Sequence, residues 1–189
     1  QLAALDSVSE VVVSEISPAV IEALPLFDDE TFGASRSPKI ELVEGDAYRQ
    51  LSRERTQYDV IVSEPSNPWV AGVEMLYSEE FLTAARDRLR PGGIYVQWFH
   101  QYETSDETIE VILRTYSTVF AETAIWYSQQ ADVLVLGFAD APPPPSVMLE
   151  RLLERASDPE GAAGLAGIGI MDAPGLLAHE IAPVGVVSR

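Results

Sequence analysis

The 189-residue chain contains no cysteine and only two histidines, His100 and His179. Without cysteine it cannot form a disulfide, use a thiolate nucleophile or build a zinc–thiolate site. Two histidines far apart in the sequence, with acids scattered between them, lack the ligand spacing of a metal site. We therefore expect no metal. The absence of cysteine also fits a cytoplasmic protein.

Long apolar runs are absent as well. No run approaches the roughly 18 apolar residues that a membrane-spanning helix needs. The N-terminus has no basic region followed by an apolar core, so the sequence predicts no signal peptide. Hydrophobic residues nevertheless make up 47% of the chain, which predicts a globular fold rather than disorder.

Basic residues are scarce. The chain has 30 acidic and 12 basic residues, a net charge of −18, and Lys39 is its only lysine. Such a surface would repel phosphate backbones, so nucleic acid is not an expected partner. It would attract a cationic substrate such as a polyamine. The same charge also serves solubility or adaptation to salt, and by itself it identifies no site.

Strand and helix patterns alternate along the first 120 residues. This alternation predicts a parallel, doubly wound α/β sheet with right-handed crossovers. Two later strands, at 124–127 and 133–138, are expected to be antiparallel. The expected early strands lie at 9–14, 40–44, 58–62 and 94–99, and the expected helices at 18–27, 48–55, 79–90 and 105–120.

Local signals define the ends of several helices. Ser17 before Pro18 predicts one N-cap, and Ser78 predicts another. Thr104 and Glu107 have the spacing of a capping box. The sequence Pro-Gly-Gly at 91–93 is expected to stop the helix that begins after Ser78.

The prolines at 142–145 divide the chain into two expected parts. Residues 1–141 are expected to form the α/β domain, and residues 142–189 a Pro-rich spacer followed by a helical tail. In the tail we expect a helix at 147–155, a Gly/Ala-rich connection and a weaker helix at 176–181.

Acidic residues follow three consecutive predicted strands: Glu15, Asp46 and Glu64. In open α/β sheets, ligands bind outside the carboxyl ends of the strands, and an acid there commonly holds the hydroxyls of a ribose. Two prolines, Pro65 and Pro68, stiffen the segment after Glu64. This edge of the sheet is therefore the predicted ligand site.

Five segments occur in the order V-V-V-S-E-I-S-P-A-V-I-E, V-E-G-D-A, Y-D-V-I-V-S-E-P-S-N-P-W, L-Y-S-E-E-F and L-R-P-G-G-I-Y-V-Q-W. Together they resemble the spermidine synthase family, the polyamine aminopropyltransferases, over roughly residues 2–138. The similarity is greatest to bacterial spermidine-synthase-like proteins. It implies the Rossmann-like fold of class I S-adenosylmethionine-dependent methyltransferases, a mostly parallel sheet with an antiparallel C-terminal strand. It also implies a first strand and a Gly-rich nucleoside loop before Gln1.

The resemblance implies a role for each matching residue. Glu64 corresponds to the catalytic carboxylate that deprotonates the attacking amine. The residues implied for the nucleoside of decarboxylated S-adenosylmethionine or S-adenosylmethionine are Glu15 at the ribose, Asp46 and Ala47 at the adenine, and Ser63. The residues implied for an amine such as putrescine are Asn67, Tyr77 and Gln97.

The sequence departs from the family at the predicted site. Glu64 stands where true spermidine synthases have an aspartate, and Asn67, in place of a second aspartate, cannot accept a proton. The P-T-Y-x-S-G segment of the family is not visible between Phe99 and Phe138. These departures leave the function open between aminopropyl transfer and an inactive nucleoside-binding or regulatory module.

A methyltransferase on the same fold is a further alternative, because fold does not decide the reaction. Amino-methyltransferases often carry N-P-P-aromatic at this strand end, and S-N-P-W lacks the second proline. The resemblance also allows a homodimer. It allows a fusion to membrane-transporter-like segments upstream, which would make the chain a cytoplasmic domain of a membrane protein.

Overall fold

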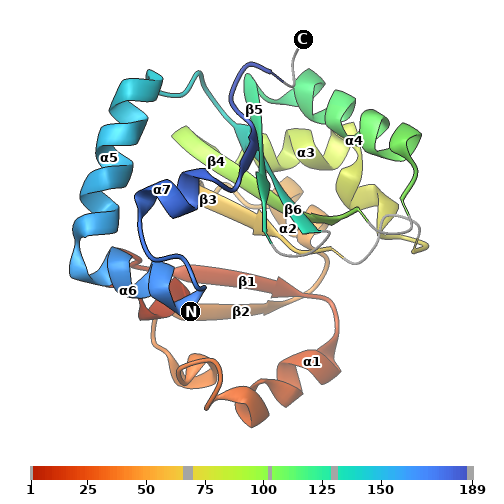
Figure 1. The fold of residues 1–189 in the computed structure, drawn as a ribbon. Coiled ribbons are helices and arrows are strands. Elements are labelled where there is room, and N and C mark those ends of the chain that lie inside the picture. Colours follow the sequence, from red (N-terminus) through yellow and green to blue (C-terminus); the bar gives the residue numbers. More distant parts are fainter. Residues whose placement is uncertain (1, 66–69, 102–103, 129–131, 187–189) are drawn as a thin grey trace. The chain divides into compact units, whose positions relative to one another are not determined.

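The computed structural model describes residues 2–65, 70–101, 104–128 and 132–186 (Figure 1). The chain divides into two compact units, unit 1 with residues 1–55 and unit 2 with residues 56–189. In the described part of the chain, no helix is both long and apolar enough to cross a membrane.

Unit 1 is built on two parallel strands, β1 (Val11–Glu15) and β2 (Ile40–Glu44), paired in register from Val11↔Ile40 to Glu15↔Glu44. Both strands lie within a few residues of their predicted positions. The shorter elements of this unit are η1 (Leu2–Ala4), α1 (Pro18–Ala23), η2 (Leu24–Phe27), η3 (Ala34–Arg36) and α2 (Ala47–Arg53).

Pro18 and Pro25 shape the first helix. Pro18 occupies its first turn, as predicted, and the helix changes to the 3-10 form at Leu24, next to Pro25. Ser17 stands at the N-cap, but its side chain makes no capping bond. The Glu15 carboxylate instead accepts the Ser17 N–H at 2.7 Å. The side-chain cap predicted for Ser17 is therefore wrong, because the Val20 N–H of the first turn bonds to the Ser17 carbonyl at 3.1 Å instead.

Unit 2 contains a five-stranded sheet in the order β3-β4-β6-β5-β7. β3 and β4 are parallel, whereas β6 is antiparallel to both β4 and β5, as predicted. The strands are β3 (Tyr58–Ser63), β4 (Leu89–His100), β5 (Glu122–Tyr127), β6 (Asp132–Phe138) and β7 (Glu180–Ala182).

The helices next to this sheet have different ends from those expected. Figure 1 shows α3 (Glu79–Arg86) and α4 (Asp106–Val119) beside each other. α3 stops at Arg86 because β4 already begins at Leu89, so the Pro-Gly-Gly at 91–93 lies within β4 rather than ending a helix. The N-cap of α4 is Ser105, whose hydroxyl accepts the Thr108 N–H at 3.2 Å. The capping box predicted one residue earlier is wrong.

The core of unit 2 lies between the sheet and these two helices. Alternate residues of β4 point into it, among them Tyr95 and Phe99, which are 0% and 3% exposed. The Tyr95 ring stacks on Phe120 at 5.5 Å between centroids. Gly137 lies directly beneath Phe120, where a Cβ atom would come within 2.4 Å of the ring. A side chain at position 137 would therefore displace the aromatic core.

The opposite face of the sheet is more open. Val60 and Val62 of β3 are 53% and 47% exposed, although a parallel strand of this composition is expected to be buried on both faces. Among the described residues, no strand pairs with the outer edge of β3, and β1 and β2 form a separate sheet. The single sheet predicted from the alternation therefore appears as two.

The C-terminal tail differs most from its prediction. It contains α5 (Pro145–Ser157), α6 (Pro159–Gly167) and α7 (Ala173–Leu177). The Gly/Ala-rich connection is helical as α6, because Asp158 caps it by accepting the Gly161 N–H. The helix predicted at 176–181 is wrong: α7 ends at Leu177, and β7 pairs antiparallel with β5.

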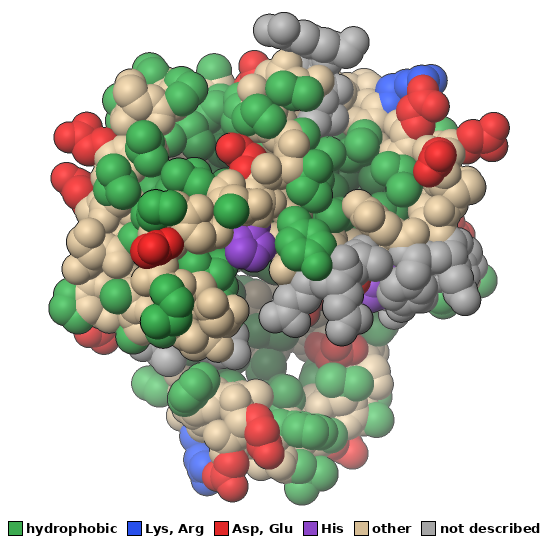
Figure 2. Space-filling view, viewed as in Figure 1, with side chains coloured by type: hydrophobic (Ala, Val, Ile, Leu, Met, Phe, Trp, Pro, Cys, Tyr) green, Lys and Arg blue, Asp and Glu red, His purple; other side chains and the backbone are tan. Residues whose placement is uncertain are grey.

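Acidic side chains are scattered over the face shown in Figure 2.

Thr123 of β5 provides a test of how the core of unit 2 is packed. Its side chain is 1% exposed, and its hydroxyl has no hydrogen-bond partner among the described residues. We expect Thr123→Val, which keeps the shape and removes the unpaired hydroxyl, to raise the free energy of unfolding by about 1 kcal/mol. Urea denaturation measures it. The control Thr123→Ser keeps the hydroxyl and loses the methyl group, and it should be less stable than the wild type. A less stable Thr123→Val would contradict the packing described above.

Candidate functional site

Glu15 and Asp46 lie at the same edge of the unit 1 sheet. The Gly45 N–H donates to the Glu15 carbonyl at 2.9 Å, which ties the carboxyl ends of β1 and β2 together. The Asp46 carboxylate caps α2 by accepting the Arg49 N–H at 2.7 Å, and Ala47 is the first residue of that helix. Sequence reasoning did not single out Glu44, which pairs with Glu15 across the sheet. This edge thus gathers several carboxylates beside a helix N-terminus.

The corresponding edge of the unit 2 sheet carries Glu64. Ser63 ends β3 and lies opposite Gln97 of β4, and Glu64 follows as an exposed residue. Pro65 is buried. Asn67, predicted to bind the amine, lies outside the described residues.

A buried polar network lies next to this edge. It consists of Ser63, Tyr95, Gln97 and Tyr116, together with the Leu76 carbonyl, and is called the Gln97 network below. The Tyr116 hydroxyl donates to Gln97 Oε1, as does the Tyr95 hydroxyl at 3.3 Å. Gln97 Nε2 donates to the Leu76 carbonyl at 3.3 Å, and the Ser63 hydroxyl hydrogen-bonds to the Tyr95 hydroxyl.

Gln97 and Ser63, two predicted ligand residues, belong to this network. Gln97 is 1% exposed, so its amide belongs to the interior of unit 2 and not to an open surface. Ser63 is half-buried, and its hydroxyl bonds to the same group of side chains. Tyr116 lies within the helix predicted at 105–120, and its bond to Gln97 was not predicted. The helical spacing showed burial, but nothing in the sequence reveals the partner.

Tyr77 ends η4 (Glu74–Tyr77) and is 8% exposed. Its ring meets Phe99 edge-on, with 6.2 Å between centroids. Burial raises the pKa of Tyr77 to about 12. Burial also raises the pKa of Tyr95 and of Tyr116, and the nearby Tyr77 phenol raises both further. At neutral pH the three phenols are therefore uncharged hydrogen-bonding groups.

His100 and Asp132 form a pair at the end of β4. His100 Nδ1 and Asp132 Oδ1 are 2.7 Å apart, and the side chains are 14% and 27% exposed. Because β3 and β4 are parallel, this pair lies at the same edge of the sheet as Glu64. Asp132 was not predicted, since only the β4–β6 register places it opposite His100.

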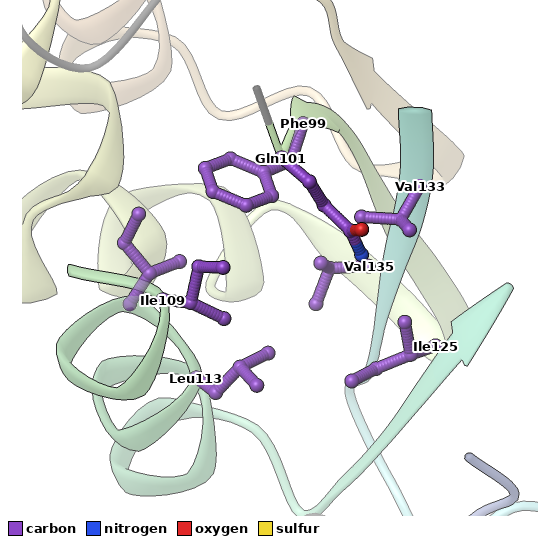
Figure 3. Close-up of a pocket in the computed structure, with 8 residues that line it drawn as sticks. Phe99, Gln101, Ile109, Leu113, Ile125, Val133 and Val135 are labelled. Atoms are coloured by element: carbon purple, nitrogen blue, oxygen red, sulfur yellow. The ribbon is translucent and has the colours of Figure 1, made fainter. Parts of the chain in front are cut away.

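A cavity of about 40 Å³ lies between α4 and the sheet. Figure 3 shows Ile109 and Leu113 of α4 facing Val133 and Val135 of β6 across it. A space of this size with an apolar lining cannot hold a nucleoside. Among the described residues, no group of three or more His, Asp or Glu side chains could hold a metal ion.

The family model for the spermine/spermidine synthase domain matches residues 1–131. The chain belongs to this family. It is similar to the polyamine aminopropyltransferase of Synechococcus sp., with 29% identity over 96% of the chain and 63% of that relative. It is also similar to polyamine aminopropyltransferase 1 of Pseudomonas aeruginosa, with 31% identity over 67% of the chain and 43% of that relative.

Solved structures confirm the predicted fold class. A spermidine synthase in complex with the transition state analogue AdoDATO matches with a TM-score of 0.73 and 18% identity, over 95% of this chain and 60% of that one. Human methyltransferase-like protein 13 in complex with SAH matches with a TM-score of 0.61 and 17% identity, over 75% of this chain and 67% of that one. The fold is thus the α/β fold that these two kinds of protein share.

The chain spans less than two thirds of the length of the aminopropyltransferases and the spermidine synthase described above. Family membership and fold follow from the matches. The reaction and its substrates are therefore proposals.

The buried phenol of Tyr77 predicts a pH dependence. Its pKa is 10.0 when unperturbed and about 12 in the folded chain, so between these pH values the unfolded chain releases a proton that the folded chain keeps. The stability from Tyr77 is therefore complete below pH 10.0 and is lost as the pH rises toward about 12. We expect the free energy of unfolding of Tyr77→Phe to fall less steeply over this range. Urea denaturation at several alkaline pH values measures it, and equal slopes would contradict the burial of the phenol.

Proposed function

We propose that this protein takes part in aminopropyl transfer, moving an aminopropyl group from decarboxylated S-adenosylmethionine to an amine such as putrescine. The observation that carries the proposal is the position of Glu64. It is exposed directly after β3, at the carboxyl edge of a parallel strand pair, in a chain of the spermine/spermidine synthase domain family. Ligands of open α/β sheets bind at such an edge.

The nucleoside of the co-substrate is assigned to unit 1. Glu15 ends β1 and Asp46 follows the adjacent parallel strand β2, and both are carboxylates able to accept hydroxyl or amine hydrogens. Ala47, at the start of α2, has a small side chain that leaves room for a flat base. An adenosyl co-substrate also agrees with the AdoDATO and SAH complexes among the fold relatives.

Glu64 acts as the proton acceptor. An amine attacks the carbon next to the sulfonium only when its nitrogen lone pair is free, and a carboxylate within hydrogen-bond reach takes the proton. The new C–N bond forms as the C–S bond breaks, and the electron pair of that bond goes to sulfur. The products are methylthioadenosine, which is neutral at sulfur, and the aminopropylated amine. Positioning supplies much of the rate, because the sulfonium is already an activated leaving group.

The amine is attracted by charge. A chain with a net charge of −18 gives a polycation a favourable potential on approach. Asn67 and Tyr77 stay predicted contacts of the amine. A cytoplasmic location, a homodimer and a membrane-transporter-like fusion partner likewise stay predictions from the resemblance.

Methyl transfer is the second candidate function. The observation in its favour is the fold similarity to human methyltransferase-like protein 13. The sequence S-N-P-W after β3 lacks the second proline of the amino-methyltransferase signature. The family match to the spermine/spermidine synthase domain favours aminopropyl transfer.

Calorimetry with methylthioadenosine tests the nucleoside site. It is made on the protein in its natural length, because the chain spans less than two thirds of the relatives that it matches. Glu15→Gln keeps an acceptor for the Ser17 N–H but loses the charge that would hold the ribose. We expect binding to the wild type and a roughly ten-fold or greater weakening in Glu15→Gln. No detectable binding to the wild type would overturn the proposal.

A second experiment tests the proton acceptor. Glu64→Gln keeps the shape of the side chain and removes its basicity, so we expect turnover to be lost while affinity for methylthioadenosine changes by less than about three-fold. His100→Asn removes the imidazole at the same edge of the sheet and should retain turnover. If Glu64→Gln turns over normally and His100→Asn does not, the acceptor is the His100–Asp132 pair and not Glu64.

A further inference from the structure

One amide side chain joins three elements of unit 2. Gln97 of β4 accepts a hydrogen bond from Tyr116 of α4, and it donates one to the Leu76 carbonyl of η4 at 3.3 Å. Tyr95, also of β4, donates to the same amide oxygen at 3.3 Å. The Gln97 amide therefore connects β4 and α4 to the backbone of η4.

The Gln97 network contacts the residue that precedes Glu64 and the residue that precedes Tyr77. Ser63, whose hydroxyl bonds to Tyr95, directly precedes Glu64. Leu76, whose carbonyl accepts from Gln97, directly precedes Tyr77. The residue before the proposed proton acceptor and the residue before the predicted amine contact are therefore held by the same set of side chains.

This network is buried deeply enough to be rigid. Tyr95, Gln97 and Tyr116 are 0%, 1% and 1% exposed. A buried polar group that loses its partner pays the full cost of desolvation, since water does not replace the bond. The alternative positions of η4, in which the Leu76 carbonyl leaves Gln97, are therefore disfavoured.

We propose that Gln97 is a positioning residue that fixes Glu64 and Tyr77 relative to each other through the Tyr95 hydroxyl and the Leu76 carbonyl. The inference rests on the proposed function, because it gives the two fixed residues their roles. Gln97 itself does not touch the amine. Its amide is occupied inside unit 2, so it acts on the reaction through the residues that it holds.

Glutamine suits this position for a specific chemical reason. Its carbonyl accepts the two tyrosine hydroxyls while its NH₂ group donates to the Leu76 carbonyl. Glutamate in its charged form has no donor, and methionine has neither group. Asparagine carries both groups but is one methylene shorter, so it cannot reach Leu76 and the tyrosines together.

Hydrogen exchange of the full 189-residue chain tests the proposal. The probe is the peptide covering η4 (Glu74–Tyr77) in Gln97→Met and in the milder Gln97→Asn. The matched control is Val135→Ala. Val135 lies directly opposite Gln97 across the β4–β6 pair and is 2% exposed, so its truncation also weakens the core, but it makes no bond to Leu76.

We expect exchange at η4 to rise about ten-fold in both Gln97 variants, the factor that corresponds to losing one buried hydrogen bond. Exchange at η4 in Val135→Ala should stay at the wild-type rate. Unchanged exchange in the Gln97 variants, or an equal rise in the control, would overturn the proposal.

Kinetics separate this inference from the proposed function. Gln97→Asn should lower kcat by about ten-fold or more while affinity for methylthioadenosine, which the proposed function assigns to Glu15 and Asp46, stays constant. An unchanged kcat would overturn the positioning role. Absence of turnover in the wild type would overturn the proposed function, and the exchange experiment would still decide whether Gln97 holds η4.

Discussion

The parallel pairing of β3 with β4 is the constraint on which unit 2 depends. Its register places Ser63 opposite Gln97, so the carboxyl ends of the two strands meet and bring Glu64 and the His100–Asp132 pair to one edge. The same register turns Gln97 toward α4. A slip of β4 by one residue would exchange the two faces of that strand. The side chains of the Gln97 network on β4 would then be exposed, and apolar side chains would lie opposite their polar partners. Fold and candidate site thus rest on the same hydrogen-bonded ladder.

Much of the fold could be predicted from local patterns. The strand at 40–44 is observed at Ile40–Glu44, because β-branched and apolar residues between turn signals carry that information locally. β7 could not be predicted, since Glu180–Ala182 become a strand only by pairing with β5, more than 50 positions away. The helix α6 was missed for the opposite reason. Its glycines disfavour a helix, and the Asp158 cap outweighs them.

The candidate site could be predicted only in part, for a similar reason. Acids at strand ends are visible in the sequence, so Glu15 at the end of β1, Asp46 after β2 and Glu64 after β3 were found. The direction in which Gln97 points depends on the face of β4 that packs against α4, which the sequence does not reveal. The resemblance implied a role for Gln97, and the structure shows which residues surround it.

The central claim is that these acids serve aminopropyl transfer in a chain of the spermine/spermidine synthase domain family. Mass spectrometry of the products tests it most directly, with decarboxylated S-adenosylmethionine and S-adenosylmethionine offered in parallel, each with putrescine. We expect spermidine and methylthioadenosine from the decarboxylated donor and no methylated amine from the other. Methylated putrescine from S-adenosylmethionine, with the decarboxylated donor unconsumed, would contradict it.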